Sequence, residues 1–446
     1  MRGRWRTAVL AAGVLAACGG CRGRGGRTEL KLAHIYEPLA GPVHEEAYAF
    51  LRELAAEFEA EHPDVRLRLE QVQWDKIDRK LMSDYAAGVG HDVAMTSPQL
   101  MPQHAATGDL LDLAPMVSRW PQEVVDDLAW TASWRQSEQS GQRLGIPTGV
   151  HARVVIYRRD YFLEAGLDPD APPRDLAALL AAARALTRDT NGDGEPDVWG
   201  LGLYLGPSRA TIELYFAPLL WHFGGDLWDP ATGRAVFASD AGVQAALFLA
   251  DCLHGQRVTP PWAAGEKYDD VILQAFLDGK LAMAWGWGSY WNRILEERGW
   301  ARGIVPPRPD GGSDKVGVFV TPTAAGQQFA NAWTLSIHAL SRQPELALAL
   351  IEKWMEPQAL DRFVDAGLPA RRSAWARPQY QTAWYKEWYR ACEAGRPMPG
   401  TPHYNHLADS VAAALQEIVL QRADAAATLA RYQEEFNGRY APGAGR

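Results

Sequence analysis

The sequence predicts an α/β protein with two or three domains, and three observations support this prediction. The chain has 446 residues, more than a single hydrophobic core usually organises. Apolar residues make up 47% of it and charged residues 22%, which is ordinary for globular proteins. Short β-branched runs alternate with amphipathic helical segments, an order that produces a parallel sheet covered by helices.

The N-terminal part shows this alternation clearly. Strands are predicted where apolar and charged residues alternate or β-branched residues cluster, and helices where one face is apolar. Pro38, Gly41 and Pro42 break the chain after the first strand. The predicted elements are strands over 29–36, 65–72 and 91–95 and helices over 45–61, 74–88 and 127–134.

The stretch over 144–203 leads the chain into a second region. Gly145, Pro147 and Gly149 predict a turn or a crossing. The predicted elements that follow are a buried strand over 153–157, a helical turn over 160–165, a helix over 175–187 with one apolar face, an acidic turn over 189–194 and a strand over 198–203.

The remaining half continues with helices and few strands. Ser239 or Asp240 is a suitable N-cap for the helix that follows. Residues 303–330 are rich in Pro and Gly and are predicted to be a crossing segment. The predicted elements are helices over 213–221, 240–253, 268–278, 344–355, 376–394 and 404–437 and a strand over 333–337.

The first residues form a targeting segment that is separate from the fold. Three arginines precede an apolar run over 8–17 that is too short to span a bilayer. The run ends in LAAC, which resembles the lipobox of bacterial lipoproteins and implies a signal peptide over 1–17 and lipidation of Cys18. An ordinary secretory signal with a chance cysteine is the alternative. The Gly/Arg-rich residues 18–27 are predicted to be a flexible tether.

Several sequence phrases together resemble the bacterial extracellular solute-binding proteins of family 1. This is the maltose-binding-protein-like class that feeds ABC transporters, and the resemblance extends from about residue 30 to 436. The phrases are GIP at 145–147, YRRDYFLEAGL at 157–167, PRDL at 173–176, DTNGDGEPDVWG at 189–200, GGDL at 224–227, GKLAM at 279–283 and GLPAR at 367–371. Each phrase alone is weak, and their common order is what makes the resemblance specific.

The resemblance implies a type II periplasmic-binding-protein fold, in which two lobes are joined by a hinge and enclose a cleft. Lobe 1 would comprise residues 28–148 and 329–372, and lobe 2 residues 149–328 and 373–446. The implied function is the extracytoplasmic substrate-binding component of an ABC importer, anchored by lipid to the bacterial cell envelope. Such a monomer would bind a sugar or oligosaccharide by hinge closure and deliver it to a membrane permease.

Two other functions remain open from the sequence. One is a binding protein for non-sugar cargo, such as a polyol phosphate or a peptide. The other is a surface carbohydrate-active enzyme, but the sequence contains no nucleophile elbow, P-loop or HExxH motif. Adjacent acids such as Glu45 and Glu46 do not face each other on a helix, so they do not resemble a glycosidase pair. A net charge of −9 argues against a nucleic-acid partner.

An aromatic run over 285–291 is the strongest ligand-binding candidate. In an extended segment alternate side chains share a side, so Trp285, Trp287 and Trp291 are predicted to line one wall with Ser289. The two glycines that flank Trp287 predict a ring with one face free to stack on a sugar.

Further ligand contacts follow only from the family resemblance, because in that family they come from loops at the strand ends that face the cleft. The implied positions are Tyr36, Glu37, Ser97, Gln99, His151, Trp221, Trp287, Tyr290, Trp333, Arg371 and Tyr404.

The acidic turn also resembles the first half of a calcium loop. Asp189, Asn191, Asp193 and Asp197 have the spacing of ligand positions one, three, five and nine, but Gly200 stands where the bidentate Glu belongs. A tight Asx/Gly turn is the alternative. No cofactor is otherwise required.

The cysteines leave a second question open. Two of them, Cys252 and Cys392, either pair as a disulfide in an oxidising compartment or stay separate as buried thiols.

Overall fold

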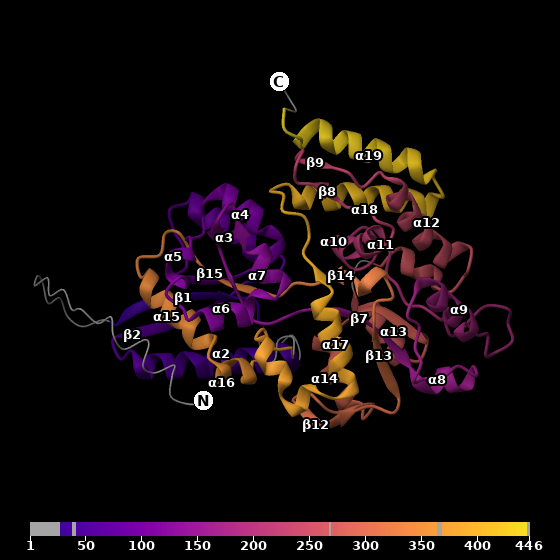
Figure 1. Cartoon of the computed structure of the whole chain (residues 1–446), viewed down its shortest axis with the longest axis horizontal. Coiled ribbons are helices and arrows are strands. Elements are labelled where there is room, and N and C mark those ends of the chain that lie inside the picture. Colours follow the sequence, from indigo (N-terminus) through magenta and orange to yellow (C-terminus); the bar gives the residue numbers. More distant parts are fainter. Residues whose placement is uncertain (1–26, 38–41, 267–268, 364–367, 444–446) are drawn as a thin grey trace, which may run out of the picture.

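A computed structural model describes residues 27–37, 42–266, 269–363 and 368–443. The predicted signal peptide, Cys18 and residues 18–26 of the tether lie outside the described residues. Within the described ranges, no helix is long and apolar enough to cross a bilayer. The structure confirms the α/β class, and Figure 1 shows two lobes side by side.

The first lobe is built on a five-stranded sheet with the order β2-β1-β3-β15-β6. Strand β1 is parallel to β2 and β3, whereas β15 is antiparallel to β3 and β6. The strands are β1 (Thr28–His34), β2 (Val65–Gln71), β3 (Val93–Thr96), β6 (Ile146–Pro147) and β15 (Thr334–Ile337). The helices of this lobe are α2 (Pro42–Glu61), α3 (Ile77–Ala86), α4 (Met101–Thr107), α5 (Ala114–Val117), α6 (Gln122–Ala129), α7 (Ala132–Gln136), α15 (Pro344–Trp354) and α16 (Pro357–Arg362).

The helix predicted over 127–134 is wrong, because two short helices meet there. The side chain of Thr131 accepts a hydrogen bond from the backbone N–H of Trp134 at 3.1 Å and so caps the start of α7. The chain leaves helical geometry at this cap, and α6 ends at Ala129.

The second lobe contains a three-stranded antiparallel sheet with the order β10-β7-β13. Its strands are β7 (Arg153–Arg158), β10 (Met283–Gly288) and β13 (Val316–Val320). Strand β13 lies in the segment predicted to be a crossing, so that prediction is wrong for residues 316–320. The run VGVFV is apolar, four of its five residues are buried, and it pairs with β7 along its full length.

Helices surround this second sheet, and most come from the C-terminal half. They are α8 (Arg159–Glu164), α9 (Leu176–Leu186), α10 (Arg209–Thr211), the π-helix η2 (Ile212–Phe216), α11 (Ala217–His222), α12 (Asp240–His254), α13 (Asp269–Leu277), α14 (Asn292–Glu297), α17 (Ala383–Glu393), α18 (Tyr404–Gln421) and α19 (Ala425–Tyr440). The single helix predicted over 404–437 is therefore two helices. Arg422 has a φ of 55°, which ends α18, and the side chain of Asp424 caps α19.

The strand predicted over 198–203 is also wrong. Only isolated bridges form there, between Val198 and Arg188, between Trp199 and Leu281 and between Gly202 and Ala284. Gly200 lies so close to the backbone of Ala183 that a Cβ would stand 1.9 Å from its carbonyl oxygen. The segment therefore lies directly against α9 and forms no continuous ladder of strand hydrogen bonds.

Short elements complete the fold. The remaining strands are β4 (Glu138–Gln139), β5 (Gln142–Arg143), β8 (Trp228–Asp229), β9 (Arg234–Ala235), β11 (Arg302–Ile304), β12 (Pro307–Gly312), β14 (Gln328–Phe329) and β16 (Gly395–Arg396). Single 3₁₀ turns are η1 (Pro98–Leu100), η3 (Pro261–Ala264), η4 (Ser289–Trp291), η5 (Ala324–Gly326), η6 (Arg372–Ala376) and η7 (Pro378–Tyr380).

Backbone hydrogen bonds join the segments by which the chain passes between the lobes. The first segment follows β6 and the second precedes β15. His151 and Asn331 exchange N–H···O bonds of 2.5 and 3.0 Å, and the N–H of Val150 donates to the carbonyl of Leu368 at 3.3 Å. The crossings therefore form one connected unit.

The two cysteines do not pair. Cys252 and Cys392 are both free and buried, so the separate-thiol alternative is the correct one. Burial raises the pKa of both thiols, which keeps them protonated and unreactive at neutral pH.

Two buried histidines of the first lobe have opposite environments. Burial disfavours the charged form of His104, but Asp109 and Asp78 each accept a hydrogen bond from its ring at 2.9 Å and raise its pKa to about 9. His34 is fully buried at the end of β1, and burial lowers its pKa to about 4.

These two shifts predict that the combined contribution of His104 and His34 to the free energy of unfolding is greatest near pH 6.5, the ordinary pKa of both groups in the unfolded chain. The ion pairing of His104 stabilises fully below that pH and is lost as the pH rises through about 9. The neutral His34 opposes folding increasingly as the pH falls from 6.5 toward about 4. Urea unfolding between pH 5 and 9 measures both effects. His104→Gln should flatten the alkaline side, and an unchanged alkaline decline in that variant would refute the assignment.

Candidate functional site

Polar side chains from both lobes gather where the lobes face each other. In open α/β sheets, ligands bind beyond the carboxyl ends of the strands, and β1 and β3 end on this side of the first lobe. In the second lobe, antiparallel pairing places Arg153 at the start of β7 opposite Gly288 at the end of β10. We treat this lobe interface as the candidate site.

A buried carboxylate forms the centre of the second lobe's contribution. Glu213 lies in the π-helix η2 and is 6% exposed. The hydroxyl of Tyr404, at the start of α18, donates to its Oε1 at 2.7 Å, and Arg209 Nε lies 3.3 Å from the same oxygen. Burial raises the pKa of Glu213, and Arg209 opposes that rise. Single π-helical turns are frequent at functional sites, because they redirect side chains within a helix.

Arg153 and Tyr290 lie beside this cluster, where the strands β7 and β10 begin and end. The Arg153 guanidinium lies over the Tyr290 ring, 5.3 Å from its centroid. The charge of Arg153 also favours the ionised form of Glu213. Cation–π contact and charge pairing together fix the orientation of the guanidinium.

The first lobe contributes Asp78, which organises the end of β3. Its carboxylate accepts hydrogen bonds from the backbone N–H and hydroxyl of Ser97 at 3.0 and 2.6 Å, and from His104. Burial lowers the pKa of the Arg209 guanidinium, but the charges of Glu213, Tyr404 and Asp78 outweigh this effect and raise it. Asp409 of α18 acts in the same direction.

Two further contacts lie around this centre. An ion pair between Glu46 of α2 and Arg293 of α14 joins the lobes directly. Gln99 is buried and its Oε1 accepts a hydrogen bond of 3.3 Å from the Nδ2 of Asn331 on a crossing segment. His151 pairs with the backbone of the same Asn331, so Gln99 and His151 both lie at the hinge.

The predicted residues after β1 also reach this side of the first lobe. Tyr36 is 1% exposed, and its ring lies edge-on to His44 and Phe363 at 6.0 and 5.9 Å. Glu37 is exposed, and its backbone N–H donates to the Nδ1 of His44 at 3.1 Å.

The predicted aromatic wall is wrong. Trp287 is fully buried, and its ring packs against Phe276 and Trp291 with centroids 5.5 and 4.9 Å away. Its indole N–H donates to Asn292 Oδ1 at 3.3 Å. No face of the ring is free, because the side chains of Phe276 and Trp291 fill the space that the flanking glycines leave.

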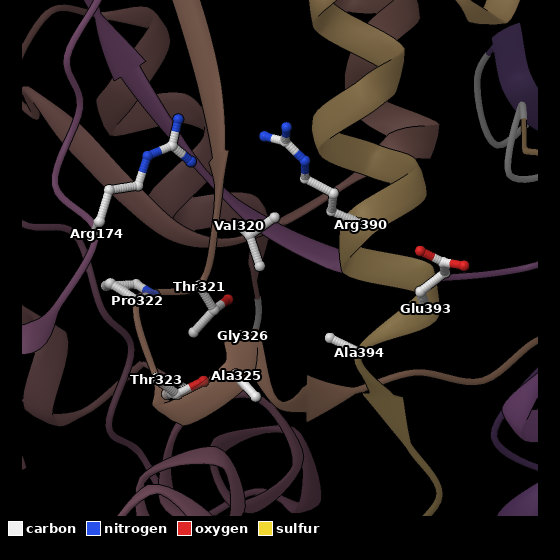
Figure 2. Close-up of a pocket in the computed structure, with 10 residues that line it drawn as sticks. All are labelled: Arg174, Val320, Thr321, Pro322, Thr323, Ala325, Gly326, Arg390, Glu393 and Ala394. Atoms are coloured by element: carbon white, nitrogen blue, oxygen red, sulfur yellow. The ribbon is translucent and has the colours of Figure 1, made fainter.

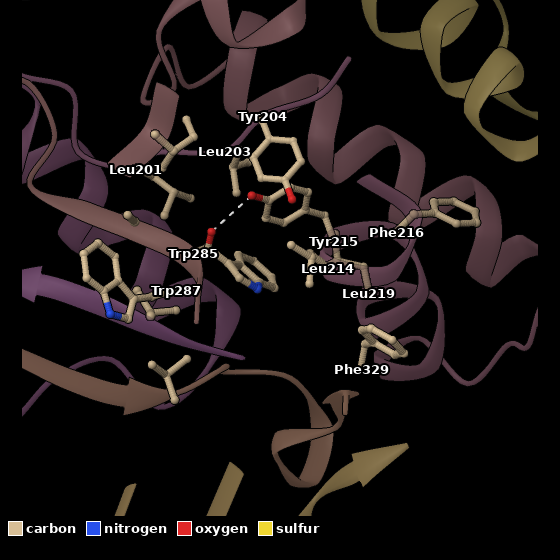
Figure 3. Close-up of a cluster of buried hydrophobic side chains, with 14 of the residues drawn as sticks. Leu201, Leu203, Tyr204, Leu214, Tyr215, Phe216, Leu219, Trp285, Trp287 and Phe329 are labelled. Atoms are coloured by element: carbon tan, nitrogen blue, oxygen red, sulfur yellow. Dashed lines mark hydrogen bonds between the residues drawn. The ribbon is translucent and has the colours of Figure 1, made fainter. Parts of the chain in front are cut away.

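A β-bulge in β10 explains why Trp285 and Trp287 do not share one side of the strand as predicted. Trp285 pairs with Val155 and Trp287 with Val154, so Gly286, with a φ of 93°, is an extra residue in the strand. Trp285 packs instead against Tyr215, whose hydroxyl donates to the Trp285 carbonyl at 3.1 Å (Figure 3). Residues 289–291 form the 3₁₀ turn η4, so the extended geometry assumed for Ser289 and Trp291 is absent.

Three other predicted residues are engaged elsewhere. Burial lowers the pKa of Arg371, whose guanidinium donates to the carbonyl of Met355 at 2.8 Å and lies 3.6 Å from Asp127. Trp221 is buried beneath Arg396. Trp333 packs against the core of the first lobe.

The structure therefore assembles part of the predicted set and adds residues that sequence reasoning missed. Tyr290 and Tyr404 belong to the cluster, with Ser97 and Gln99 on the opposite lobe. Arg153, Arg209 and Glu213 were not predicted. The sequence feature that could have indicated this cluster is Glu213, a single acid within the apolar run IELYFAPLLW.

The acidic turn of the second lobe has its own hydrogen bonds. Asp189 accepts from the backbone N–H groups of Gly192 and Gly194 at 2.6 and 2.8 Å, and Asp197 accepts from Thr190. Among the described residues, no group of three or more His, Cys, Asp or Glu side chains is arranged to hold a metal ion. The structure favours the tight-turn alternative, and calcium binding stays a prediction.

Comparison with known proteins identifies one family. Residues 41–360 match the family model described as bacterial extracellular solute-binding protein. A Sinorhizobium fredii protein named as a probable amino-acid ABC transporter periplasmic-binding protein is 23% identical over 61% of this chain. This chain spans about 57% of the length of that relative and 62% of a Brucella abortus putative binding protein, which is also 23% identical.

Solved structures show the same fold. A Thermotoga lettingae solute-binding protein bound to α-D-tagatose superposes with a TM-score of 0.75 at 21% identity, covering 92% of this chain and 99% of that one. A maltose-bound T. maritima protein gives a TM-score of 0.71 at 19% identity, with 92% and 98% covered. An Agrobacterium radiobacter protein in complex with ribitol gives 0.69 at 23% identity, with 92% and 98% covered.

The position of Trp287 generates a stability prediction. Replacing this fully buried ring with Ala should lower the free energy of unfolding by about 3–5 kcal/mol, as expected for a core Trp. Trp74→Ala is the control, because Trp74 is 51% exposed and should cost far less. Denaturant melts of both variants give the comparison, and a similar small loss in each would contradict the core assignment.

Proposed function

Because this chain belongs to the bacterial extracellular solute-binding protein family, we propose that it is the extracytoplasmic substrate-binding component of an ABC importer. It binds a sugar or oligosaccharide between its lobes, closes by hinge motion and delivers the solute to a membrane permease. The observation that carries this proposal is the convergence of Arg153, Arg209, Glu213 and Tyr404 on the surface that faces the other lobe.

The chemistry of this cluster suits a polyhydroxylated ligand. A carboxylate and a guanidinium each make paired hydrogen bonds, which match neighbouring hydroxyl groups on a sugar. The Tyr290 ring offers an apolar face beside them. Relatives support this class of ligand: the structures named above hold tagatose, maltose and ribitol, and a Bacillus subtilis arabinooligosaccharide-binding protein is 22% identical over 71% of this chain.

One observation favours a second candidate, a cargo that carries a carboxylate. Two arginines, Arg153 and Arg209, act on the buried carboxylate Glu213, and guanidinium groups of this kind can bind a carboxylate through paired hydrogen bonds. The Sinorhizobium relative is named as an amino-acid binding protein. Native mass spectrometry of the co-purified ligand separates the two candidates directly.

Binding in this proposal involves no chemical reaction. The alternative, a surface carbohydrate-active enzyme, would convert its sugar. Incubation of the purified protein with a sugar panel therefore discriminates: turnover would refute the binding proposal, and unchanged sugar with a shift in tryptophan emission would support it.

The proposal places the protein outside the cytoplasm in the bacterial cell envelope, on the periplasmic or extracellular face, held to a membrane by lipid on Cys18. The LAAC run supports the anchor, since each buried CH₂ of an acyl chain contributes about 0.8 kcal/mol to membrane binding. A Streptomyces antibioticus relative, 24% identical over 74% of this chain, is named as a lipoprotein.

For the ligand site, Glu213→Gln should weaken solute binding at least tenfold. The amide keeps the shape of the side chain but loses the charge, and hydrogen bonds to charged groups are worth about 1.5–3 kcal/mol. Titration calorimetry with the co-purified solute measures the change. Glu195→Gln is the matched control, because Glu195 is 69% exposed and pairs only with Arg257 in the structure as described. Equal affinity of wild type and Glu213→Gln would remove Glu213 from the site.

For the anchor, Cys18→Ser should abolish acylation, because the thioether site is lost. The variant should remain unprocessed or leave the membrane fraction. Gel mobility, metabolic labelling with a fatty acid and membrane fractionation follow both effects. Cys21→Ser is the matched control and should behave as wild type. Unchanged processing and fractionation of Cys18→Ser would show that the lipobox assignment is wrong.

A further inference from the structure

A pocket of about 710 Å³ lies in the second lobe and shares no residue with the candidate site. Its walls come from the end of β13, the turn η5, the last turn of α17 and the segment before α9 (Figure 2). Its volume is in the range of small-molecule sites. The polar residues in its wall are Arg174, Thr321, Thr323, Arg390 and Glu393.

Two guanidinium groups face each other across this pocket. Figure 2 shows Arg174 and Arg390 reaching toward one another from opposite walls. Both are held by Glu387 of α17, whose carboxylate lies 3.1 Å from Arg174 and 2.6 Å from Arg390. Glu387 also accepts the backbone N–H of Val320 at 3.1 Å, and its side chain is 12% exposed. A nearly buried acid thus fixes two arginines that are themselves 57% and 60% exposed.

The charges around the pocket leave one positive charge uncompensated. Glu387 balances only one of the two guanidiniums. The other acid in the wall, Glu393, is paired with Arg372 at 2.7 Å. Arg174 and Arg390 make no ion pair other than that with Glu387 in the described part of the chain, so N–H groups remain for a further acceptor.

Two residues of the wall, Thr321 and Ala325, are in energetically unfavourable environments. Thr321 is 1% exposed, and its hydroxyl has no hydrogen-bond partner in the described structure. Buried polar groups of this kind are rare and call for an explanation such as a water or ion. Ala325 has a φ of 53°, and such strained non-glycine residues cluster at ligand clamps.

We propose that this pocket binds a small oxyanion, the phosphate or carboxylate group of a solute, between Arg174 and Arg390. The planar guanidinium suits both groups, because each presents two oxygens to its paired N–H donors. Glu387 preorganises the two arginines, which reduces the side-chain entropy lost on binding. The site is independent of the solute site between the lobes.

The test measures the melting temperature of the purified full-length protein while sodium phosphate or sodium acetate replaces sodium chloride at constant ionic strength. A saturable rise is expected in the wild type. It should disappear in the double variant Arg174→Gln/Arg390→Gln, with at least a tenfold loss of affinity by calorimetry. Arg431→Gln is the matched control, because Arg431 is 46% exposed and pairs with two carboxylates of α18 and α19. It should respond as wild type does.

Each outcome of this test either supports or overturns the proposal. A response to phosphate, or to acetate alone, supports the site and identifies the group that it prefers. No saturable response, or an equal response in the double variant, overturns the proposal. Melting in chloride alone reports whether each variant is folded. The single variants keep one arginine on Glu387, so they carry the test if the double variant is unstable. Only the part of the response that the double variant loses reports on this pocket, because the arginines of the lobe interface can also bind these anions. Failure here therefore leaves the proposed solute binding unaffected.

Discussion

Hydrogen bonds between the crossing segments are the constraint on which the rest of this structure depends. Val150 bonds to Leu368, and His151 pairs with Asn331, so strands of backbone from distant parts of the chain form one narrow connection. Each lobe closes its own sheet on its own side of this connection. A few backbone torsions in such segments can absorb a lobe rotation while both cores stay packed. The architecture therefore makes the lobe interface the place where a movement of the lobes changes the contacts between them.

The lobe interface contains buried charged side chains, and these must be paired to be stable. A carboxylate removed from water is strongly disfavoured unless it is paired, and Glu213 is stabilised by Arg209 and by the hydroxyl of Tyr404. Arg209 also interacts with Asp78 of the other lobe.

The second lobe contains the same arrangement in two places, a nearly buried acid beside two arginines. At the interface Glu213 lies between Arg209 and the charge of Arg153, and in the separate pocket Glu387 lies between Arg174 and Arg390. In both places an acid with little solvent exposure orients arginines. Such a pairing fixes the orientation of the guanidinium donors in advance.

Local patterns of apolar residues were enough to predict most helices and the strands β1, β2, β3 and β15 of the first lobe, because periodicity of 2 or 3.6 residues reports which face is buried. The family phrases predicted the two-lobe fold and implied ligand contacts for Tyr290, Tyr404 and Ser97, a role that stays a prediction. Sequence alone could not show that Gly286 is a bulge, that Phe276 and Trp291 enclose Trp287, or that Glu213 meets Arg209 and Arg153. Trp291 and Arg209 lie only four residues from their partners, whereas Phe276 and Arg153 come from other elements, and only the packed tertiary structure decides which side of a strand or turn each of them occupies.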